Sequence, residues 1–317
     1  MGNYLVKRLL QVPLVLIVLI TITFFMVRFA PGGPFSGEKG IDPVIKQKLE
    51  EKYHLDKPMY QQYFLFWGNL LRGDLGPSYK EKTRTVNEII FGEKWYHFDG
   101  KFWVSTYLGL LAILLALFLG LTAGVVAGIR QNSQFDYASM AVAMTGLSVP
   151  TFVVGPLLAL VFGRYLNVLP VAGYESGVRS VPYMILPAVT LALPFAARIA
   201  RLTRAGMLEV INQDYIRTAW AKGLREQVIV VRHALRGAML PVVSFLGPAI
   251  AAMLTGSLVV EKIFAIPGIG TAFIESATNR DYTLVMGTVI LFGVLLVVMN
   301  LVVDVLYGFL DPRIRYS

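Results

Sequence analysis

Six long apolar windows constrain this chain more than any other feature of its sequence. They cover about 9–29, 104–129, 138–163, 182–200, 242–264 and 283–308. A helix of about 20 apolar residues crosses the ~30 Å hydrocarbon core of a bilayer. Backbone N–H and C=O groups find no water there, so each window is predicted to be a helix. We therefore expect an all-α integral membrane protein with six transmembrane helices.

Composition supports a membrane protein. The chain is 56% hydrophobic and only 15% charged, with a mean hydropathy of +0.61, whereas soluble domains carry roughly 25% charged residues. Lys7 and Arg8 precede the first window, as in a signal peptide. The window is long for a signal peptide and no small-residue cleavage site follows it, so we expect it to be retained as a span.

The distribution of Lys and Arg predicts the orientation. With the N-terminus inside, thirteen of these residues fall in segments on the cytoplasmic side. The short loops on the other side hold only Arg164, Arg179, Lys262 and Arg280. The positive-inside rule therefore places both termini in the cytoplasm.

Residues 30–103 differ from the rest of the chain, because basic and acidic residues nearly balance there and aromatic residues could form a small core. Pro43 suits the first position of a helix that Asp42 could cap. We expect an extracytoplasmic domain at 30–103 between helix 1 (within 1–29) and a five-helix core (104–317). Of the net charge of +9, +8 then arises outside this domain, and membrane topology explains this excess better than nucleic-acid binding.

Motifs for catalysis or metal binding do not occur. The chain has no cysteine, and its histidines (His54, His97 and His233) are not at ligand spacing. GGPFSGEK at 32–39 fails as a phosphate-binding loop, because Glu38 separates the second glycine from the lysine. Neither HExxH nor GxSxG is present. We expect no catalytic residue, no metal site and no cofactor in this chain.

Ionisable residues inside the windows are few. Asn300 and Asp304 lie one helical turn apart in the last window, and a structural role is the favoured interpretation of this pair. Nothing resembles the acidic relay of an ion-coupled transporter. The energy for any transport is therefore expected to come from another protein.

A long basic segment, about 201–241, separates two apolar windows. Its sequence predicts two short helices that meet at Gly223, the first capped by Asp214. An apolar stripe on the second helix is predicted to comprise Val228, Val231, Leu235 and Met239. Two interpretations fit: a helix on anionic lipid, or a docking element for the groove of a cytosolic partner.

This segment resembles a loop of the permease subunits of bacterial ATP-binding-cassette importers. In that family the loop reads EAA, three residues, Gly, nine residues and I-x-LP. Gly223 stands at the glycine, and Leu240–Pro241 at the LP after a spacer of sixteen residues. Arg217, Thr218 and Ala219 occupy the EAA positions, so that the Glu and the first Ala are replaced. The longer spacer and the form YIRTAxAKGL are typical of the peptide-importing branch.

Other stretches are similar to the same branch over the whole chain. They are FMVRFAPGGPF (25–35), GDLGPSYK (73–80), QNSQFDY (131–137), AMTGLSVPTFVV (143–154), EKIFAIPGIG (261–270), NRDY (279–282) and DVLYGFLDPRIRYS (304–317).

The resemblance implies a type I importer fold and a set of partners. The chain would be a multi-pass subunit of the bacterial cytoplasmic (inner) membrane that carries oligopeptides inward together with a homologous second permease. Two cytosolic ATPases would bind ATP and Mg, and an extracytoplasmic peptide-binding protein would deliver substrate. Membrane lipid would surround the chain, and no nucleic acid would bind.

The resemblance also implies site residues. The ATPase-coupling loop would comprise Asp214, Arg217, Thr218, Ala219, Lys222, Gly223, Leu224, Leu240 and Pro241. Small, polar and Pro-interrupted positions are our prediction for the pathway or gate: Thr145, Ser148, Pro150, Thr190, Pro194, Thr255, Ser257, Glu261, Pro267 and Gly268. For single pathway positions, helix–helix packing is the competing interpretation, and Glu261, Pro267 and Gly268 could instead belong to a plain capped turn.

Alternatives stay open. Related permeases import dipeptides, nickel or oligosaccharides. A secondary transporter working alone would need an ion gradient and no ATPase, and an intramembrane enzyme would need motifs that are absent.

Overall fold

The computed structural model describes residues 2–30, 33–35, 43–81, 83–93, 100–175 and 177–310. These residues are helical, apart from turns and one isolated β-bridge between Pro77 and Thr85. The chain begins with α1 (Gly2–Phe29), α2 (Pro43–Lys52), α3 (Met59–Leu70), α4 (Val86–Phe91) and α5 (Lys101–Ile129). It continues with α6 (Gln134–Ser148), α7 (Thr151–Leu158), η1 (Ala159–Tyr165), η2 (Gly177–Ser180) and α8 (Val181–Ile211). The rest comprises α9 (Asp214–Ala221), α10 (Glu226–Val228), η3 (Ile229–Ala234), α11 (Leu235–Ala238), α12 (Leu240–Leu254), α13 (Leu258–Ile263), α14 (Ile269–Asn279) and α15 (Tyr282–Leu310).

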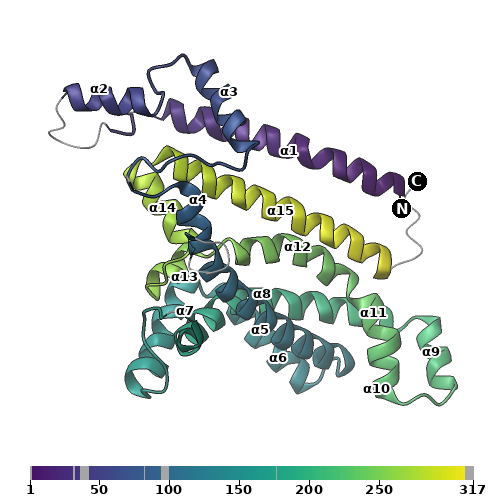
Figure 1. Ribbon diagram of the computed structural model, residues 1–317. Coiled ribbons are helices and arrows are strands. Elements are labelled where there is room, and N and C mark those ends of the chain that lie inside the picture. Colours follow the sequence, from purple (N-terminus) through teal and green to yellow (C-terminus); the bar gives the residue numbers. More distant parts are fainter. Residues whose placement is uncertain are drawn as a thin grey trace.

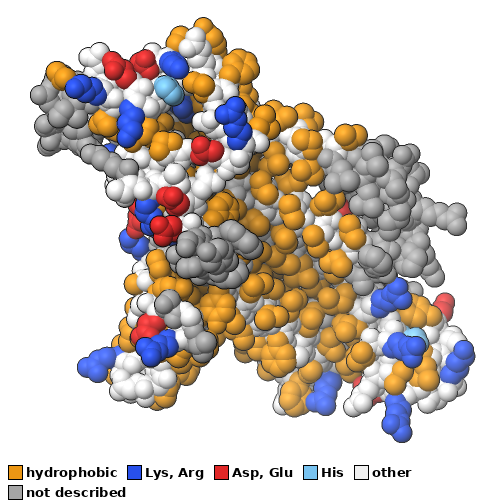
Figure 2. All heavy atoms as spheres, viewed as in Figure 1, with side chains coloured by type: hydrophobic (Ala, Val, Ile, Leu, Met, Phe, Trp, Pro, Cys, Tyr) orange, Lys and Arg blue, Asp and Glu red, His pale blue; other side chains and the backbone are white. Residues whose placement is uncertain are grey.

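Five stretches among the described residues are long and apolar enough to cross a membrane. They are Leu10–Phe29, Lys101–Ile129, Val181–Ile211, Leu240–Ile263 and Tyr282–Leu306, which match five of the six predicted windows. Figure 1 shows α1 and α15 running side by side, with the start of α1, the end of α15 and α9 at the same end of the bundle. Hydrophobic side chains form a broad band between two charged ends (Figure 2), as a bilayer requires.

The predicted helix at 138–163 is wrong as a single straight element. The chain there bends by 106° between Gln134–Ser148 and Thr151–Tyr165. Pro150 has no N–H for the helix, and the residue before a proline is pushed out of the helical region; Val149 accordingly has φ −85° and ψ 120°. Only if the bent pair counts as one span does the described chain reach six.

The centre of the bundle is a glycine-mediated contact between α5 and α8. A Cβ at Gly120 would lie 2.7 Å from the carbonyl oxygen of Ala196, and one at Gly124 would lie 2.6 Å from that of Ala200. Gly128 instead makes room for the Met207 side chain, whose Cβ would lie 2.5 Å from an added Cβ. The helices therefore touch backbone to backbone, as expected from small residues in membrane helices.

The segment between α1 and α5 shares its buried clusters with the long helices. Val86, Ile89 and Ile90 of α4 pack with Ile269 and Leu284. Phe35 and Tyr79 pack with Tyr282 in a second cluster. Aromatic residues of 30–103 thus do form a small cluster, as the sequence suggested, but residues of α1, α14 and α15 share in the buried clusters of this segment. Pro43 begins α2 as predicted, whereas Asp42 lies outside the described residues.

Replacing Gly124 by Ala tests the α5–α8 contact. The new methyl would lie 2.5 Å from Cβ of Thr203, and overpacking of this kind costs about 1–3 kcal/mol. We expect a lower melting temperature of the purified chain by scanning fluorimetry in detergent. The matched control is Gly68→Ala in α3, where an added Cβ meets nothing within 4 Å. Equal melting temperatures for the two variants would contradict the contact.

Candidate functional site

A buried carboxylate organises residues 261–270, which hold the predicted gate residues Glu261, Pro267 and Gly268 and are called the gate segment below. Glu261 lies in α13 with 0% of its surface exposed. Its Oε1 accepts a hydrogen bond from the Ser105 hydroxyl of α5 at 2.7 Å, and its Oε2 accepts one from the Thr271 N–H of α14 at 3.0 Å. Ser105 in turn accepts a hydrogen bond from the Ile269 N–H at 2.8 Å. One carboxylate thus joins three helices.

Three glycines leave the space for this carboxylate. A Cβ would lie 2.1 Å from Oε1 at Gly256, 2.4 Å from Cδ at Gly268 and 3.0 Å from Oε2 at Gly270. Gly256 also has a φ of +83°, which non-glycine residues rarely adopt. Any side chain at these positions would push Glu261 away. Glu261 and Gly268, both predicted site residues, are therefore brought together, whereas Pro267 is exposed.

Glu261 and Ser105 provide hydrogen-bond acceptors for the N–H groups at the amino end of α14. The first N–H groups of a helix have no partner within the helix and carry partial positive charge. Ser105 and Glu261 accept two of them, those of Ile269 and Thr271. This arrangement fixes a buried carboxyl group and a helix end at once. Nothing in the sequence marked Ser105, because its role depends on a residue 156 positions away.

A cavity of about 340 Å³ lies next to this network, between the α12–α13 break and α15. It is lined by Thr255, Gly256, Leu258, Ile269, Gly270, Phe273, Thr288, Val289 and Phe292. Thr255, which was predicted for the pathway, lines this cavity. Ser257 instead caps α13, where its hydroxyl accepts a hydrogen bond from the Val260 N–H at 3.4 Å.

The other predicted pathway residues lie on different helices. Thr145, Ser148 and Pro150 are exposed around the bend between α6 and α7, and the two hydroxyls donate to carbonyls of their own helix. Thr190 is buried in α8 and donates to the Leu186 carbonyl at 2.8 Å. Pro194 is half-buried in α8. This chain alone therefore does not bring the ten residues together around one cavity.

The basic segment forms a hairpin, as predicted. α9 turns at Gly223, whose φ is +72° and whose added Cβ would meet nothing within 4 Å. Ile216 and Ala219 of α9 are buried against Ile229 and Ala234. Residues exposed at the tip include Arg217, Thr218, Trp220, Lys222 and Gly223. Ala219 therefore holds the hairpin together and does not contribute to its outer surface.

One local prediction for the start of the hairpin is wrong. Asp214 is the first residue of α9 and does not cap it; Gln213 is at the cap position. Asp214 lies 3.7 Å from Arg217, and an acid still suits the first turn. Leu224 is half-buried against the hairpin core, and Leu240–Pro241 opens α12 as expected.

The predicted apolar stripe is also wrong. Val231 is 67% exposed and Val228 is exposed too, whereas Ile229, Val230, Ala234 and Ala238 are buried. Residues 229–234 form a π-helix, which has more residues per turn than an α-helix. The wider turn moves the buried face by one residue.

An ion pair with a buried carboxylate connects α8, the helix that leads into the hairpin, to α6, the first helix of the bent pair α6–α7. Arg204 of α8 donates to both carboxylate oxygens of Asp136 at the start of α6, at 2.6 and 2.8 Å. The Asp136 side chain is almost fully buried. Two-point Arg–carboxylate pairs fix orientation as well as distance. The pair therefore fixes the position of α6 on α8.

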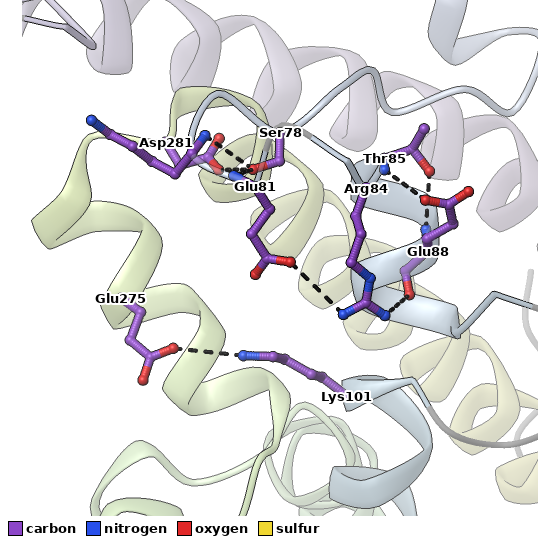
Figure 3. A network of polar contacts seen from close by, with 9 residues as sticks. Ser78, Glu81, Arg84, Thr85, Glu88, Lys101, Glu275 and Asp281 are labelled. Carbon is purple, nitrogen blue, oxygen red and sulfur yellow. Dashed lines mark hydrogen bonds and ion pairs between the residues drawn. The ribbon is translucent and has the colours of Figure 1, made fainter.

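At the opposite end of the bundle, Asp281 holds the segment before α4 (Figure 3). Its carboxylate accepts hydrogen bonds from the Ser78 hydroxyl and, at 3.1 Å, from the Tyr79 N–H. Thr283 adds a bond to the Pro77 carbonyl at 2.7 Å. Burial raises the pKa of Tyr79 to about 12. GDLGPSYK and NRDY, noted separately in the sequence, are thus partners in space.

Comparisons with known proteins agree with this architecture. A family model described as binding-protein-dependent transport system inner membrane component matches residues 120–316. The chain is 45% identical to the oligopeptide transport system permease protein OppB of Haemophilus influenzae and 46% identical to that of Escherichia coli K12, with all of each chain covered. It is 42% identical to the dipeptide transport system permease protein DppB of Bacillus subtilis, over 99% of this chain and 98% of that one.

One solved structure has a similar fold. A chain of the MetNI methionine ABC transporter in inward-facing conformations aligns with a TM-score of 0.53 at 16% identity. The alignment covers 68% of this chain and 97% of that chain.

Replacing Ser105 by Ala is expected to destabilise the gate segment. The change removes the donor to Glu261 and the acceptor of the Ile269 N–H, and a buried unpaired polar group costs about 1–3 kcal/mol. The melting temperature should fall relative to Ser148→Ala, which removes an exposed hydroxyl bonded within its own helix. If the two variants have the same melting temperature, the hydrogen bonds of Ser105 do not stabilise the fold.

Replacing Asp281 by Ala is expected to release the segment 76–86. Backbone amides there should exchange hydrogen faster, as measured by mass spectrometry on the intact chain. Glu275→Ala is the control, because that carboxylate makes only a partly exposed ion pair with Lys101 at 3.6 Å, and such pairs contribute little. Unchanged protection in the Asp281 variant would show that this contact is dispensable.

Proposed function

We propose that this chain, which belongs to the binding-protein-dependent transport system inner membrane component family, is a permease subunit of an ABC importer that carries oligopeptides inward. The observation that carries the proposal is its identity of 45–46% to oligopeptide permease proteins over the full length of both chains. The chain is a transport subunit and has no catalytic role. Hydrolysis of ATP, with its Mg, belongs to partner ATPases.

The hairpin at 201–241 is the element that receives the force of the ATPases. Its exposed tip at Arg217, Thr218, Lys222 and Gly223 supports this role, because the tight turn at Gly223 lets the tip enter a groove of a partner. The Ile216–Ala219 face packs on η3, so that the tip moves with its support. The two-point contact of Arg204 with Asp136 then passes the motion of α8 to α6.

The pathway forms between this subunit and a homologous second permease. The bend at Pro150 leaves polar residues exposed, and the cavity at Thr255 lies beside the gate segment. Both surfaces are complete only with a partner. ATP-driven closure of the ATPases turns the pathway outward, and hydrolysis returns it inward, by rigid-body rocking.

The chain sits in the bacterial cytoplasmic membrane with both termini in the cytoplasm. The positive-inside distribution of Lys and Arg supports this orientation. The segment 30–103 then lies outside, where it meets an extracytoplasmic peptide-binding protein.

Dipeptide import is the second candidate function. The 42% identity to a dipeptide permease protein over 99% of the chain favours it. Competition experiments separate the two: we expect a labelled tetrapeptide or pentapeptide to be taken up and to resist competition by excess dipeptide. Uptake restricted to dipeptides would select the alternative.

Replacing Gly223 by Trp tests the coupling role. A side chain there is strained by the φ of +72° and enlarges the docking surface. We expect ATP-dependent peptide uptake to fall at least tenfold in vesicles that hold this chain, its partner permease, the ATPases and the binding protein. Stimulation of the ATPase by loaded binding protein should be lost as well.

Gly177→Trp is the matched control. Gly177 has a φ of +71° and also has nothing within 4 Å of an added Cβ, but it lies outside the hairpin. Uptake should survive in this variant. Unchanged uptake in the Gly223 variant would instead mean that residues 215–241 lie on the lipid surface. Uptake that depends on an ion gradient and persists without the ATPases would refute the proposed function itself.

A further inference from the structure

The helix α3 has an apolar face that the rest of the protein covers only in part. Tyr63, Phe66 and Trp67 pack on one side against the cluster around Phe24 of α1. The adjacent side bears Tyr60, Phe64 and Leu71, which are 61%, 68% and 82% exposed. At 3.6 residues per turn these two groups form one continuous arc. The apolar arc therefore extends beyond what α1 covers.

Contacts with α1 set the depth of α3. The Tyr63 hydroxyl bonds to the Thr21 hydroxyl at 2.8 Å, and Arg28 donates to Gln62 at 2.9 Å. Thr21 lies eight residues before the end of the apolar stretch at Phe29, or ~12 Å along a helix. Figure 1 shows α3 crossing this part of α1. The middle of α3 is therefore level with the membrane-spanning part of α1.

The part of α1 that α3 crosses also has an exposed apolar face. Ile22, Met26 and Phe29 are exposed on this same part of α1. A side chain at this depth of a transmembrane helix faces lipid wherever protein does not cover it. Tyr60 and Phe64 extend this lipid-facing surface sideways.

Charged side chains flank α3 and do not occur within it. Residues Met59–Leu70 contain no charged side chain. A shallow groove of about 440 Å³ runs along the helix, with Lys57 at one end and Arg72 at the other. Long cationic side chains reach from an apolar surface to lipid phosphates, and Tyr and Trp are enriched at this level of the bilayer.

We propose that α3 is an interfacial helix that lies in the bilayer surface, with Tyr60, Phe64 and Leu71 among acyl chains and Lys57 and Arg72 at the lipid phosphates. The outer leaflet follows from the proposed function, whereas the contact with lipid follows from the depth of α3 on α1. The helix widens the footprint of α1 in the membrane. It also accounts for the two aromatic residues of α3, Tyr60 and Phe64, that do not pack against α1.

Single cysteines test the proposal cleanly, because the chain contains none. Spin labels at Phe64→Cys and Leu71→Cys are compared with labels at Gln61→Cys and Asn69→Cys on the polar side of the same region. The full-length chain is reconstituted in vesicles of phosphatidylethanolamine and phosphatidylglycerol. Collision with oxygen, which partitions into lipid, is measured against collision with a water-soluble nickel chelate.

We expect the ratio of oxygen to nickel accessibility to be at least threefold higher at positions 64 and 71 than at 61 and 69. Equal ratios at all four positions would overturn the proposal. Nickel accessibility at 64 and 71 that disappears only when binding protein is added would overturn it too, because this face would then dock a protein. Peptide uptake by the same variants reports separately on the proposed function, since the accessibility pattern requires no transport.

Discussion

The backbone contact between α5 and α8 is the constraint on which the rest of the structure depends. Apolar surface gains little from leaving lipid for another apolar surface, so membrane helices are held by close packing and by internal polar contacts. Gly120, Gly124 and Gly128 supply the packing. The remaining helices attach to this pair by similar means: Gly109 of α5 admits the carbonyl of Met253, and Gly206 of α8 admits that of Ala238. The hairpin and the gate segment are thus built onto the same two helices.

Carboxylates within or beside the bundle hold elements together at its two ends. Asp136 fixes α6 to α8, Glu261 joins α5, α13 and α14, and Asp281 retains the segment before α4. Each accepts more than one hydrogen bond, which offsets the cost of removing a charge from water. Their placement suits a protein that moves as a few rigid parts, because the joints between helices are specific while the surfaces toward lipid are not.

The sequence predicted the long helices well and the polar contacts poorly, for a physical reason. Apolar length and Gly or Pro position are local properties, so five windows, the hairpin and the turn at Gly223 could be read directly. The bend at Pro150 depended on whether neighbouring helices would support a kink or a break. The π-turn at 229–234 exchanged Val231 for Val230 in the core, a choice that periodicity cannot make. Ser105 had no signal at all, and the stretch that holds Ser78 gave no sign of its partner, since both partners lie far away in the chain.

The contact of Ser78 with Asp281 spans 203 residues, and this separation has a consequence for biogenesis. The segment before α4 is made early, but its buried partners at the start of α15 are made last. At a synthesis rate of roughly 5–20 residues per second, the segment waits ~10–40 s before it can fold. During that interval its apolar residues are exposed to proteases and chaperones. Completion of the last helix therefore serves as the step that protects the first loop, so a chain truncated before α15 would be recognised and degraded from this loop.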